Sequence, residues 1–324
     1  MTESRYPIRP LAFEGISTYP LRSRKSKVST DLFGRPASAT DTVGSFIEKL
    51  PRILAADGFR NLVEAIRKAR QSGGALIWGM GGHVVKCGLG PILIDLMREG
   101  FVTGIAMNGA AMIHDFEIAL SGSTSEEVEN ELGSGRFGMA QETGEYLNRA
   151  VNEGQRRGLG AGESVGAFMT SEDHGIRFEH PDASILHEAY ARAIPVTVHL
   201  AIGTDITHLH PEASGGSLGD SSMTDFRLLC AMVRDLQRGV YVNLGSAVIL
   251  PEVFLKAVSV VRNLGTRLDD FTTANLDFIQ HYRPTQNVLR RPTENGGRAI
   301  ALTGHHEIMV PLLAAALKGD PASK

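Results

Sequence analysis

The sequence predicts an α/β fold, a Rossmann-like parallel sheet with helices on both faces. The first indication is a short apolar run, 75–78, followed by a glycine-rich stretch and then by apolar residues at helical spacing. The second is a neighbouring apolar run, 101–107, which ends in small and polar residues. The third is a later repeat of strand, glycine-rich stretch and helix over 195–236. Such repetition is typical of layered α/β proteins.

Composition narrows the class of protein. The chain has 324 residues, of which 42% are hydrophobic and 21% charged, and its net charge of −3 gives no reason to expect a nucleic-acid partner. Two cysteines, Cys87 and Cys230, are too few for a disulfide framework and fit a reducing compartment, although a single pairing stays open. We find neither a signal peptide in the first twenty residues nor the roughly 18 apolar residues of a membrane span. We therefore expect a soluble cytoplasmic protein without a membrane partner.

The chain divides into an N-terminal arm, residues 1–44, and a single α/β domain, residues 45–324. The arm is rich in Pro, Ser, Arg and Gly and contains a basic run at 22–27, so it is interpreted as a solvated arm or a strap on a neighbouring subunit. The alternative is a lobe that closes over an anionic ligand. Within 43–69, helical spacing predicts two helices, separated near Pro51 and Gly58, that cover one face of the sheet.

The middle of the chain predicts further helices and one strand. Ser123 to Glu126 has the order of a helix-capping sequence, and helices are expected over 137–157, 161–172 and 183–193. A buried strand over 195–201 leads into the second glycine-rich segment, Gly215 to Asp220, which we expect to be a loop before the next helix.

The C-terminal part continues the alternation. Strands are expected over 240–244, 270–276 and 299–303, a helix over 251–263, and a last helix that opens at residues 305–307. Between the last two strands, residues 280–298 are predicted to form a polar, arginine-rich loop.

Three stretches resemble deoxyhypusine synthase. They are the pattern from Gly81 to Asp115, the run SILHEAYARAIPV (184–196) with its later GSLGD (216–220), and NLGSAV (243–248). The resemblance covers roughly residues 50–315 in order. It implies a Rossmann-like fold, NAD as cofactor, a homotetramer with active sites between subunits, and transfer of an aminobutyl group from spermidine to a protein lysine.

Carried over by position, the resemblance also implies site residues. The NAD-contacting loop falls on Gly81–Gly88 and the segment beside the nicotinamide on Met107–Ala111. The family's acidic Glu-Glu-Asp becomes Ile113-His114-Asp115, and its glycine signature becomes Gly215–Asp220. The cofactor-binding residues expected from this carry-over are Gly81, Gly82, His83, Asn108, Gly109, Ala110, Gly216, Ser217 and Gly245.

The sequence departs from the family at the catalytic lysine, where Leu250 stands. Leucine has no nucleophilic nitrogen and cannot form the covalent imine, so orthodox deoxyhypusine synthesis is not expected. Lys256 lies six residues on but is expected to point elsewhere, so Lys86 in the first glycine loop is the better spare amine, either as a nucleophile or as a phosphate partner or solvated side chain. The family's acidic substrate-binding stretch is replaced by arginines, which favour carboxylate or phosphate groups. We expect Arg283, Arg290, Arg291 and His305 to contact substrate.

Other polar residues suggest catalytic roles. His114 beside Asp115 suggests a general base, and the alternative is a packed histidine beside a helix cap. Asp220 either orients a ribose or an amine, or caps a helix that starts at Ser221 or Ser222. His208 and His210 have the residue type and spacing of metal ligands but lack a defined third ligand.

These observations predict an NAD-binding enzyme that acts on an amine or small anionic metabolite by oxidation, elimination or transfer. Two alternatives stay open: a metal-assisted hydrolase or lyase that uses His208 and His210, and a catalytically inactive ligand-binding homologue. We also expect a homo-oligomer, with a tetramer favoured.

Overall fold

A six-stranded parallel sheet forms the centre of the computed structural model, which describes residues 5–319. The strand order is β3-β2-β1-β4-β5-β6, which confirms the predicted fold class. The strands are β1 (Leu76–Met80), β2 (Gly104–Asn108), β3 (Val196–His199), β4 (Val240–Leu244), β5 (Thr272–Asp277) and β6 (Arg298–Thr303). The first four residues of the expected arm and the last five of the expected domain lie outside the described residues.

The order of the strands places a topological switch point beside β1. The chain moves outward from β1 to β2 and β3, and then returns to add β4 on the other side of β1. Trp78 therefore pairs in register with Ile105 of β2 and with Val242 of β4. In open α/β sheets, ligands bind at the carboxyl ends of the strands where such a reversal occurs.

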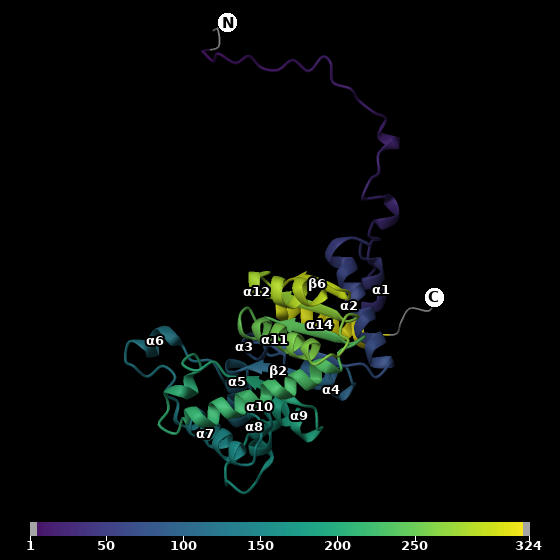
Figure 1. Cartoon of the computed structure of the whole chain (residues 1–324). Helices are drawn as coiled ribbons and strands as arrows, with labels where there is room; N and C mark the ends of the chain where they lie inside the picture. The colour runs from purple at the N-terminus through teal and green to yellow at the C-terminus, as the bar shows by residue number, and fades with distance from the viewer. Residues whose placement is uncertain (1–4, 320–324) are drawn as a thin grey trace.

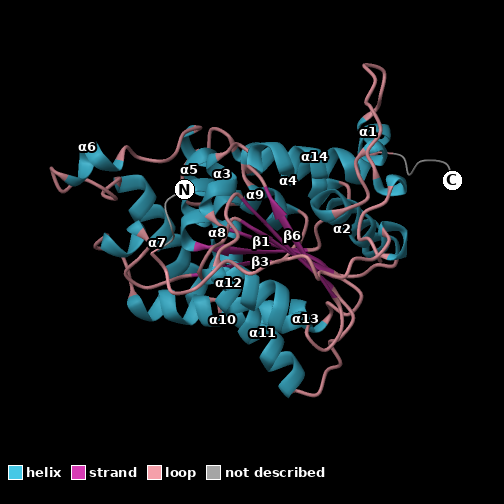
Figure 2. Ribbon diagram, turned by 90° about the horizontal axis from the view of Figure 1, so that it is seen from above, coloured by secondary structure: helices cyan, strands magenta, loops and turns pink. Residues whose placement is uncertain are grey.

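Helices cover both faces of the sheet (Figure 2). On one face lie α2 (Leu54–Gln71), α3 (Gly82–Lys86), α4 (Gly90–Arg98), α5 (Gly109–Ser121), α9 (Ile185–Ala191) and α14 (His306–Lys318). On the other face lie α10 (Gly215–Arg234) and α11 (Ile249–Asn263). The remaining α-helices are α1 (Val43–Lys49), α6 (Val128–Leu132), α7 (Gln141–Arg156), α8 (Ala161–Thr170), α12 (Tyr282–Pro284) and α13 (Arg291–Thr293), with a π-helix, η5 (Thr285–Arg290). Four short 3-10 turns complete the elements: η1 (Leu21–Ser23), η2 (Thr30–Leu32), η3 (Pro181–Ala183) and η4 (Ile206–Leu209).

The sheet separates two hydrophobic cores. Successive side chains of a strand point to opposite faces, so Leu76, Trp78 and Met80 belong to the core under α2, α4 and α5. Ile77 belongs to the core under α10 and α11, together with Tyr241. Because both faces are covered, β1 is buried along its whole length, which explains its continuous apolar sequence.

Several predicted boundaries were wrong. The expected glycine loop after β1 contains the helix α3, and the expected polar loop 280–298 is mostly helical, formed by α12, η5 and α13. Gly58 lies inside α2, whereas the break at Pro51 is confirmed. The Gly215–Asp220 segment is the first part of α10, because Ser214 caps that helix by accepting a hydrogen bond from Ser217 N. The Ser123–Glu126 segment does not cap a helix, since the next helix begins at Val128. Glu126 instead accepts a hydrogen bond from Gly138 N.

The N-terminal arm extends away from the body of the protein (Figure 1). Between residues 5 and 42 its only regular elements are the two turns η1 and η2. Its larger apolar side chains are more than half exposed, as for Tyr6, Ile8, Leu11, Phe13, Ile16, Tyr19, Leu21, Val28 and Phe33. Within residues 5–319, no helix combines the length and the apolar character needed to cross a bilayer.

Candidate functional site

Two turns that are far apart in the sequence meet at the switch point. Gly81, which follows β1, donates its N–H to Leu244 O of β4 at 3.1 Å. A Cβ on Gly81 would lie 3.0 Å from Gly245 O, so only a glycine fits without movement of the neighbouring turn. Gly245 itself has φ +60°, and a Cβ there would lie 2.8 Å from the imidazole of His306. The structure therefore brings Gly81 and Gly245 together.

Four helices begin at this carboxyl edge of the sheet. They are α3 after β1, α5 after β2, α11 after β4 and α14 after β6. The N-cap residues of α3, α11 and α14 make no side-chain cap bond, although Ser246 Oγ accepts a hydrogen bond from Leu250 N in the first turn of α11. Asn108 caps α5 by accepting a hydrogen bond from Ala111 N at 2.9 Å. Uncapped amides and the helix dipole together attract anionic groups such as phosphates.

The end of β2 differs from that of a standard dinucleotide-binding sheet. Such sheets commonly carry an acidic residue there that binds the ribose hydroxyls. Here β2 ends at Asn108, whose side chain is used by the α5 cap, and residues 109–114 include no carboxylate. The crevice where the Gly81 and Gly245 turns meet thus offers backbone donors for phosphates, and the acid nearest the end of β2 is Asp205, which comes from a later segment.

A cavity of about 190 Å³ lies next to the crevice, between α3, α5 and the segments around residues 125 and 205. Ala110 and His114 of α5 contribute to its lining. Five of its lining residues have titratable side chains: Lys86, His114, Glu117, Glu126 and Asp205. Three carboxylates against one lysine and one histidine make this cavity a better environment for a cationic group than for an anion.

A hydrogen-bonded network orients His114 in this cavity. His114 Nδ1 lies 2.7 Å from Thr124 Oγ1, and the Thr124 hydroxyl in turn donates to Glu117. Glu117 also accepts a hydrogen bond from Thr143 at 2.9 Å. Burial raises the pKa of Glu117, but the hydrogen bonds from His114, Thr124 and Thr143 outweigh burial and lower that pKa below its usual value. With Nδ1 occupied by Thr124, Nε2 is the nitrogen of His114 left for proton transfer.

Asp205 approaches the start of α5 from the other side of the cavity. A Cβ on Gly109 would collide with its carboxylate, so the glycine makes room for this acid at the helix N-terminus. Asp205 accepts a hydrogen bond from Ala201 N, and His208 Nε2 lies 3.8 Å from it. Burial raises the pKa of Asp205 despite the opposing effect of His208.

Asp115 lies elsewhere. It is completely buried and holds the start of α9, where it accepts hydrogen bonds from the Ser184 hydroxyl and from the N–H groups of Ile185 and Leu186. Burial raises its pKa to about 6, although these three hydrogen bonds oppose the rise. The aspartate of the expected His114-Asp115 pair is therefore a cap for a neighbouring helix, and Glu117 is the carboxylate that shares a network with His114.

The second glycine-rich segment does not join the crevice. Gly216 and Ser217 lie in the first turn of α10, beyond β3, which is two strands from β1. A Cβ on Gly215 or Gly219 would have no neighbouring atom within 4 Å. Asp220 is exposed and accepts a hydrogen bond from Gln155 of α7, so it does not cap a helix at Ser221 or Ser222.

The predicted arginines are spread along α11. Arg283 lies 3.4 Å from Glu252 in the first turn of α11, which begins at the crevice. Arg291 bonds to Asn287, and the adjacent Pro292 accepts a hydrogen bond from Arg262 near the opposite end of α11. Arg290 and Arg291 are exposed. Only Arg283 of this group lies near the carboxyl edge.

His208 and His210 face different partners. His208 Nδ1 accepts a hydrogen bond from Gly203 N, whereas His210 pairs with Glu212. Among residues 5–319, neither belongs to a group of three potential metal ligands, and the group that exists is His83, Cys87 and Glu307. Both cysteines are free in the structure.

Leu250 occupies the place of the family's lysine and is buried in the core. Its Cδ1 packs 3.1 Å from where a Cβ on Gly79 would lie, so the position is apolar and tightly filled. Lys256 pairs with Glu252 on the exposed side of α11. The remaining spare amine, Lys86, lines the cavity beside His114.

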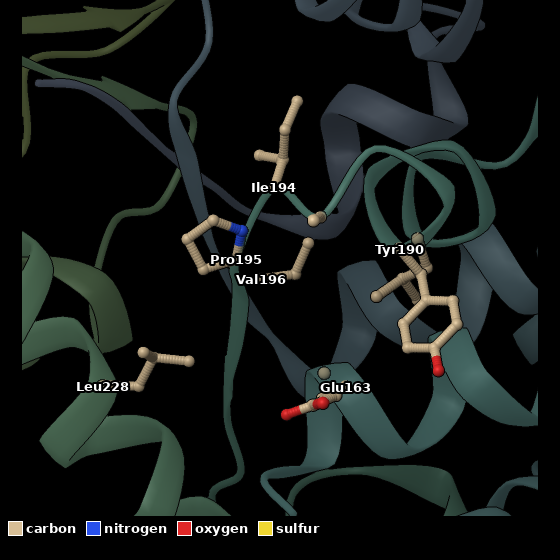
Figure 3. A pocket seen from close by; sticks show the side chains of 9 residues that line it. Glu163, Tyr190, Ile194, Pro195, Val196 and Leu228 are labelled. Atoms are coloured by element: carbon tan, nitrogen blue, oxygen red, sulfur yellow. The ribbon is translucent and has the colours of Figure 1, made fainter.

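A larger apolar cavity lies at the opposite end of β3 (Figure 3). It has a volume of about 510 Å³ and is lined by residues that include Tyr190, Pro195 and Leu228. Because Pro195 and Val196 open β3, this cavity is at the amino edge of the sheet, away from the switch point. It is therefore separate from the candidate site.

Sequence and structure comparisons give a fold but no family. No protein-family model matches the chain. No curated protein matches it. Among solved structures, unliganded AgrE superposes with a TM-score of 0.53 at 15% identity. The superposed region covers 80% of the present chain and 32% of the AgrE chain. The ternary complex of AgrE with ornithine and NAD+ gives 0.50 at 16% identity, covering 83% and 34%.

A putative deoxyhypusine synthase from Entamoeba histolytica also shares the fold. It superposes with a TM-score of 0.51 at 10% identity, covering 87% of this chain and 95% of its own. The present chain therefore spans about a third of the length of AgrE but nearly all of the Entamoeba protein. These similarities confirm the fold expected from the sequence resemblance, and at such identities they establish the fold alone.

Sequence reasoning missed three residues around His114. Glu117 lies three residues after His114 on one helical face, and this spacing was the available signal. Thr124 follows ten residues later, in the loop after α5. Asp205 comes from a loop of a distant segment, and its proximity to His114 depends on how that segment packs against α5. No short-range pattern could have found that contact.

Proposed function

We propose that the protein is an NAD-binding enzyme that oxidises a small amine-bearing metabolite. The single observation that carries this proposal is the crevice itself, where the Gly81 and Gly245 turns meet at the β1/β4 switch point beside a polar cavity. The acid-rich lining of that cavity favours an amine over the anionic substrate that the arginines suggested.

The residues present fit the phosphates of a dinucleotide. The first turn of α11 would provide N–H donors at the crevice besides the Leu250 N–H that Ser246 accepts, and this helix is long enough to carry a substantial dipole. Gly81 and Gly245 would let the phosphates approach the backbone closely. Bound in this way, NAD would supply a hydride acceptor.

The chain's own residues would bind the substrate and move its proton. Glu117, Glu126 and Asp205 would attract the amine into the cavity. His114 would act as the general base through Nε2, because its Nδ1 is held by Thr124 and Glu117. Lys86 would keep the cavity from becoming uniformly acidic. Leu250 supports oxidation over aminobutyl transfer through a lysine imine, because no amine is present at that position.

Nucleotide binding is tested by thermal unfolding. A ligand at about 100 times its dissociation constant stabilises a protein by roughly 2.7 kcal/mol, so NAD+ should raise the unfolding temperature clearly. ATP and nicotinamide mononucleotide serve as controls, because each carries only one of the two nucleotide halves of NAD+. An unchanged unfolding temperature at millimolar NAD+ and NADH would remove the proposal.

The substrate class is tested by NAD+ reduction with panels of diamino acids, polyamines and 2-hydroxy acids. One structural neighbour was solved with ornithine and NAD+, so ornithine is the first member of the amine panel. We expect turnover with an amine, and His114→Gln should reduce it by about 100-fold or more while NAD+ binding persists. Turnover confined to the hydroxy acids would contradict the amine assignment.

The assembly is also part of the proposal. We propose a homo-oligomer, most simply the tetramer implied by the resemblance, because the arm carries many exposed apolar side chains that a neighbouring subunit would cover. Light scattering on the full chain tests this, and a monomer at micromolar concentration would refute it.

A further inference from the structure

A cluster of three potential ligands lies beside the crevice and has no role in the proposed reaction. His83 and Cys87 are four residues apart at α3, so both side chains lie on one side of this turn. Glu307 joins them from the first turn of α14, 220 residues further along the chain. One ligand atom from each residue lies within 4.8 Å of the other two.

The distances match those between ligands of one metal ion. His83 Nε2 and Cys87 Sγ are 3.3 Å apart, and Cys87 Sγ and Glu307 Oε2 are 3.8 Å apart. In a tetrahedral zinc site the nitrogen and sulfur ligands lie about 2.0 and 2.3 Å from the metal, which puts such ligand pairs about 3.5 Å apart. The two observed separations fall on either side of this value.

The surroundings hold the cluster in place. His306 is almost fully buried and donates from Nε2 to Leu276 O, which fixes the first turn of α14 and hence the position of Glu307. The His306 ring also packs edge-on against His83, with centroids 5.5 Å apart. Phe278 contacts His83 from the end of β5. His83 and Glu307 are exposed and Cys87 is half-buried, so an ion could reach the cluster from solvent.

We propose that His83, Cys87 and Glu307 form a binding site for Zn²⁺ or a similar borderline-soft divalent ion. A thiolate and an imidazole select such ions over Mg²⁺ or Ca²⁺, which prefer sites made of oxygen ligands. Three protein ligands leave a fourth position for water or substrate, as in catalytic rather than structural zinc sites. The Lys86 cation acts on Cys87 and opposes metal binding, but the two anionic ligands outweigh its single charge.

This inference does not rest on the proposed NAD-dependent reaction. A thiolate and a carboxylate would repel a phosphate, so the cluster is a separate subsite of the carboxyl edge. The site also differs from the metal site that the sequence suggested, since it uses neither His208 nor His210.

Cobalt substitution of the full chain tests the proposal. Adding Co²⁺ to metal-free protein should produce a thiolate-to-cobalt charge-transfer band that saturates at one ion per chain, and Zn²⁺ should displace it. Cys87→Ser should abolish the band. The matched control is Cys230→Ser, which changes the other half-buried free thiol, in α10, and should leave the band intact.

Two further variants keep the test decisive if Cys87→Ser folds poorly. His83→Gln and Glu307→Gln alter exposed side chains. Each should weaken Zn²⁺ binding by about tenfold or more, because even the loss of a residue that only orients a metal ligand typically lowers metal affinity about 10- to 100-fold. A wild-type protein without the band, a band that survives Cys87→Ser, or unchanged Zn²⁺ affinity in both glutamine variants would overturn the proposal.

Discussion

The two glycine-rich regions of this protein look alike in sequence and differ in structure. We call Gly81, Gly82 and Gly245 the switch-point glycines and Gly215, Gly216 and Gly219 the α10 glycines. A side chain on any switch-point glycine would meet a protein atom at 3.0 Å or less. A side chain on any α10 glycine would meet nothing closer than the Ser214 hydroxyl, 3.9 Å from a Cβ on Gly216.

The difference teaches that glycine content alone does not identify a ligand site. The switch-point glycines allow the turn after β1 and the turn after β4 to touch, and this contact forms the crevice. The α10 glycines are helical residues at the protein surface, where alanine would fit equally well. What the missing side chain would contact is therefore more informative than the motif.

The largest expected effect that tests this comparison belongs to Gly245→Ala. The substitution places a Cβ at φ +60° and 2.8 Å from His306, so we expect a loss of roughly 3 kcal/mol in the free energy of unfolding. Urea denaturation measures it. A loss below about 0.5 kcal/mol, within the range of ordinary surface substitutions, would show that Gly245 is not required by its close contact with His306.

The second test concerns Asp225, the buried residue that anchors α10 to the neighbouring segments. Asp225 of α10 is buried and accepts hydrogen bonds from Gly162 N and Val198 N. Burial raises its pKa to about 7, against the hydrogen bonds that lower it. The folded protein then holds Asp225 neutral at a pH where the unfolded chain has ionised it, so this residue's contribution to stability falls as pH rises from about 4 to about 7.

Asp225→Asn removes that titration and retains an acceptor oxygen. The unfolding free energy of the wild type, measured relative to this variant, should fall by roughly 2 to 3 kcal/mol between pH 5 and pH 8. Comparing the two proteins cancels other titrating groups, including buried His199, whose depressed pKa of about 4 acts in the opposite direction. Parallel pH profiles would show that Asp225 keeps its ordinary pKa.

The third test asks which helix start receives the nucleotide. Val248→Glu adds a carboxylate at the exposed N-cap of α11, and Gly216→Glu adds one in the open first turn of α10. If phosphates bind at the switch point, the first variant should weaken NAD+ binding about tenfold, near 1.4 kcal/mol, and the second should leave it unchanged. Calorimetry decides between the two regions, and the reverse pattern would restore Gly216 and Ser217 as cofactor contacts.

The smallest effect should come from Gly216→Ala. Alanine restricts the unfolded chain and meets no steric obstacle at this helical position, so we expect a gain of about 0.5 to 1 kcal/mol in unfolding free energy. The same denaturation assay applies. A destabilised variant would mean that the α10 glycines, too, are required by close contacts.

Much of the fold could be predicted from the sequence, because central strands such as β1 and β4 are buried runs of mostly apolar residues and most helices have a regular apolar stripe. The errors fell where local signals conflict with packing. Residues 280–298 are polar and contain two prolines, yet Val288 and Leu289 anchor them against α11, which makes the segment helical. Gly82–Lys86 is too short for a periodic pattern to show.

The candidate site was less predictable, since its parts come from distant segments. The sequence identified His114 and the turns at Gly81 and Gly245, but it paired His114 with Asp115. A helix turns about 100° per residue, so adjacent residues face different directions and Glu117, one turn away, is the better partner. The His83, Cys87 and Glu307 cluster was equally hidden, because its members are joined only by the return of α14 over the sheet.

Asn108 has a consequence for the choice of coenzyme. In sheets of this strand order, the acid at the end of the second strand selects against NADP+ by repelling its 2′-phosphate. Asn108 is neutral, and its amide oxygen is already engaged with Ala111 N. The carboxylate nearest this strand end is Asp205, which comes from a later segment and lies against Gly109, so we expect this acid to disfavour the 2′-phosphate and NAD+ to bind more tightly than NADP+.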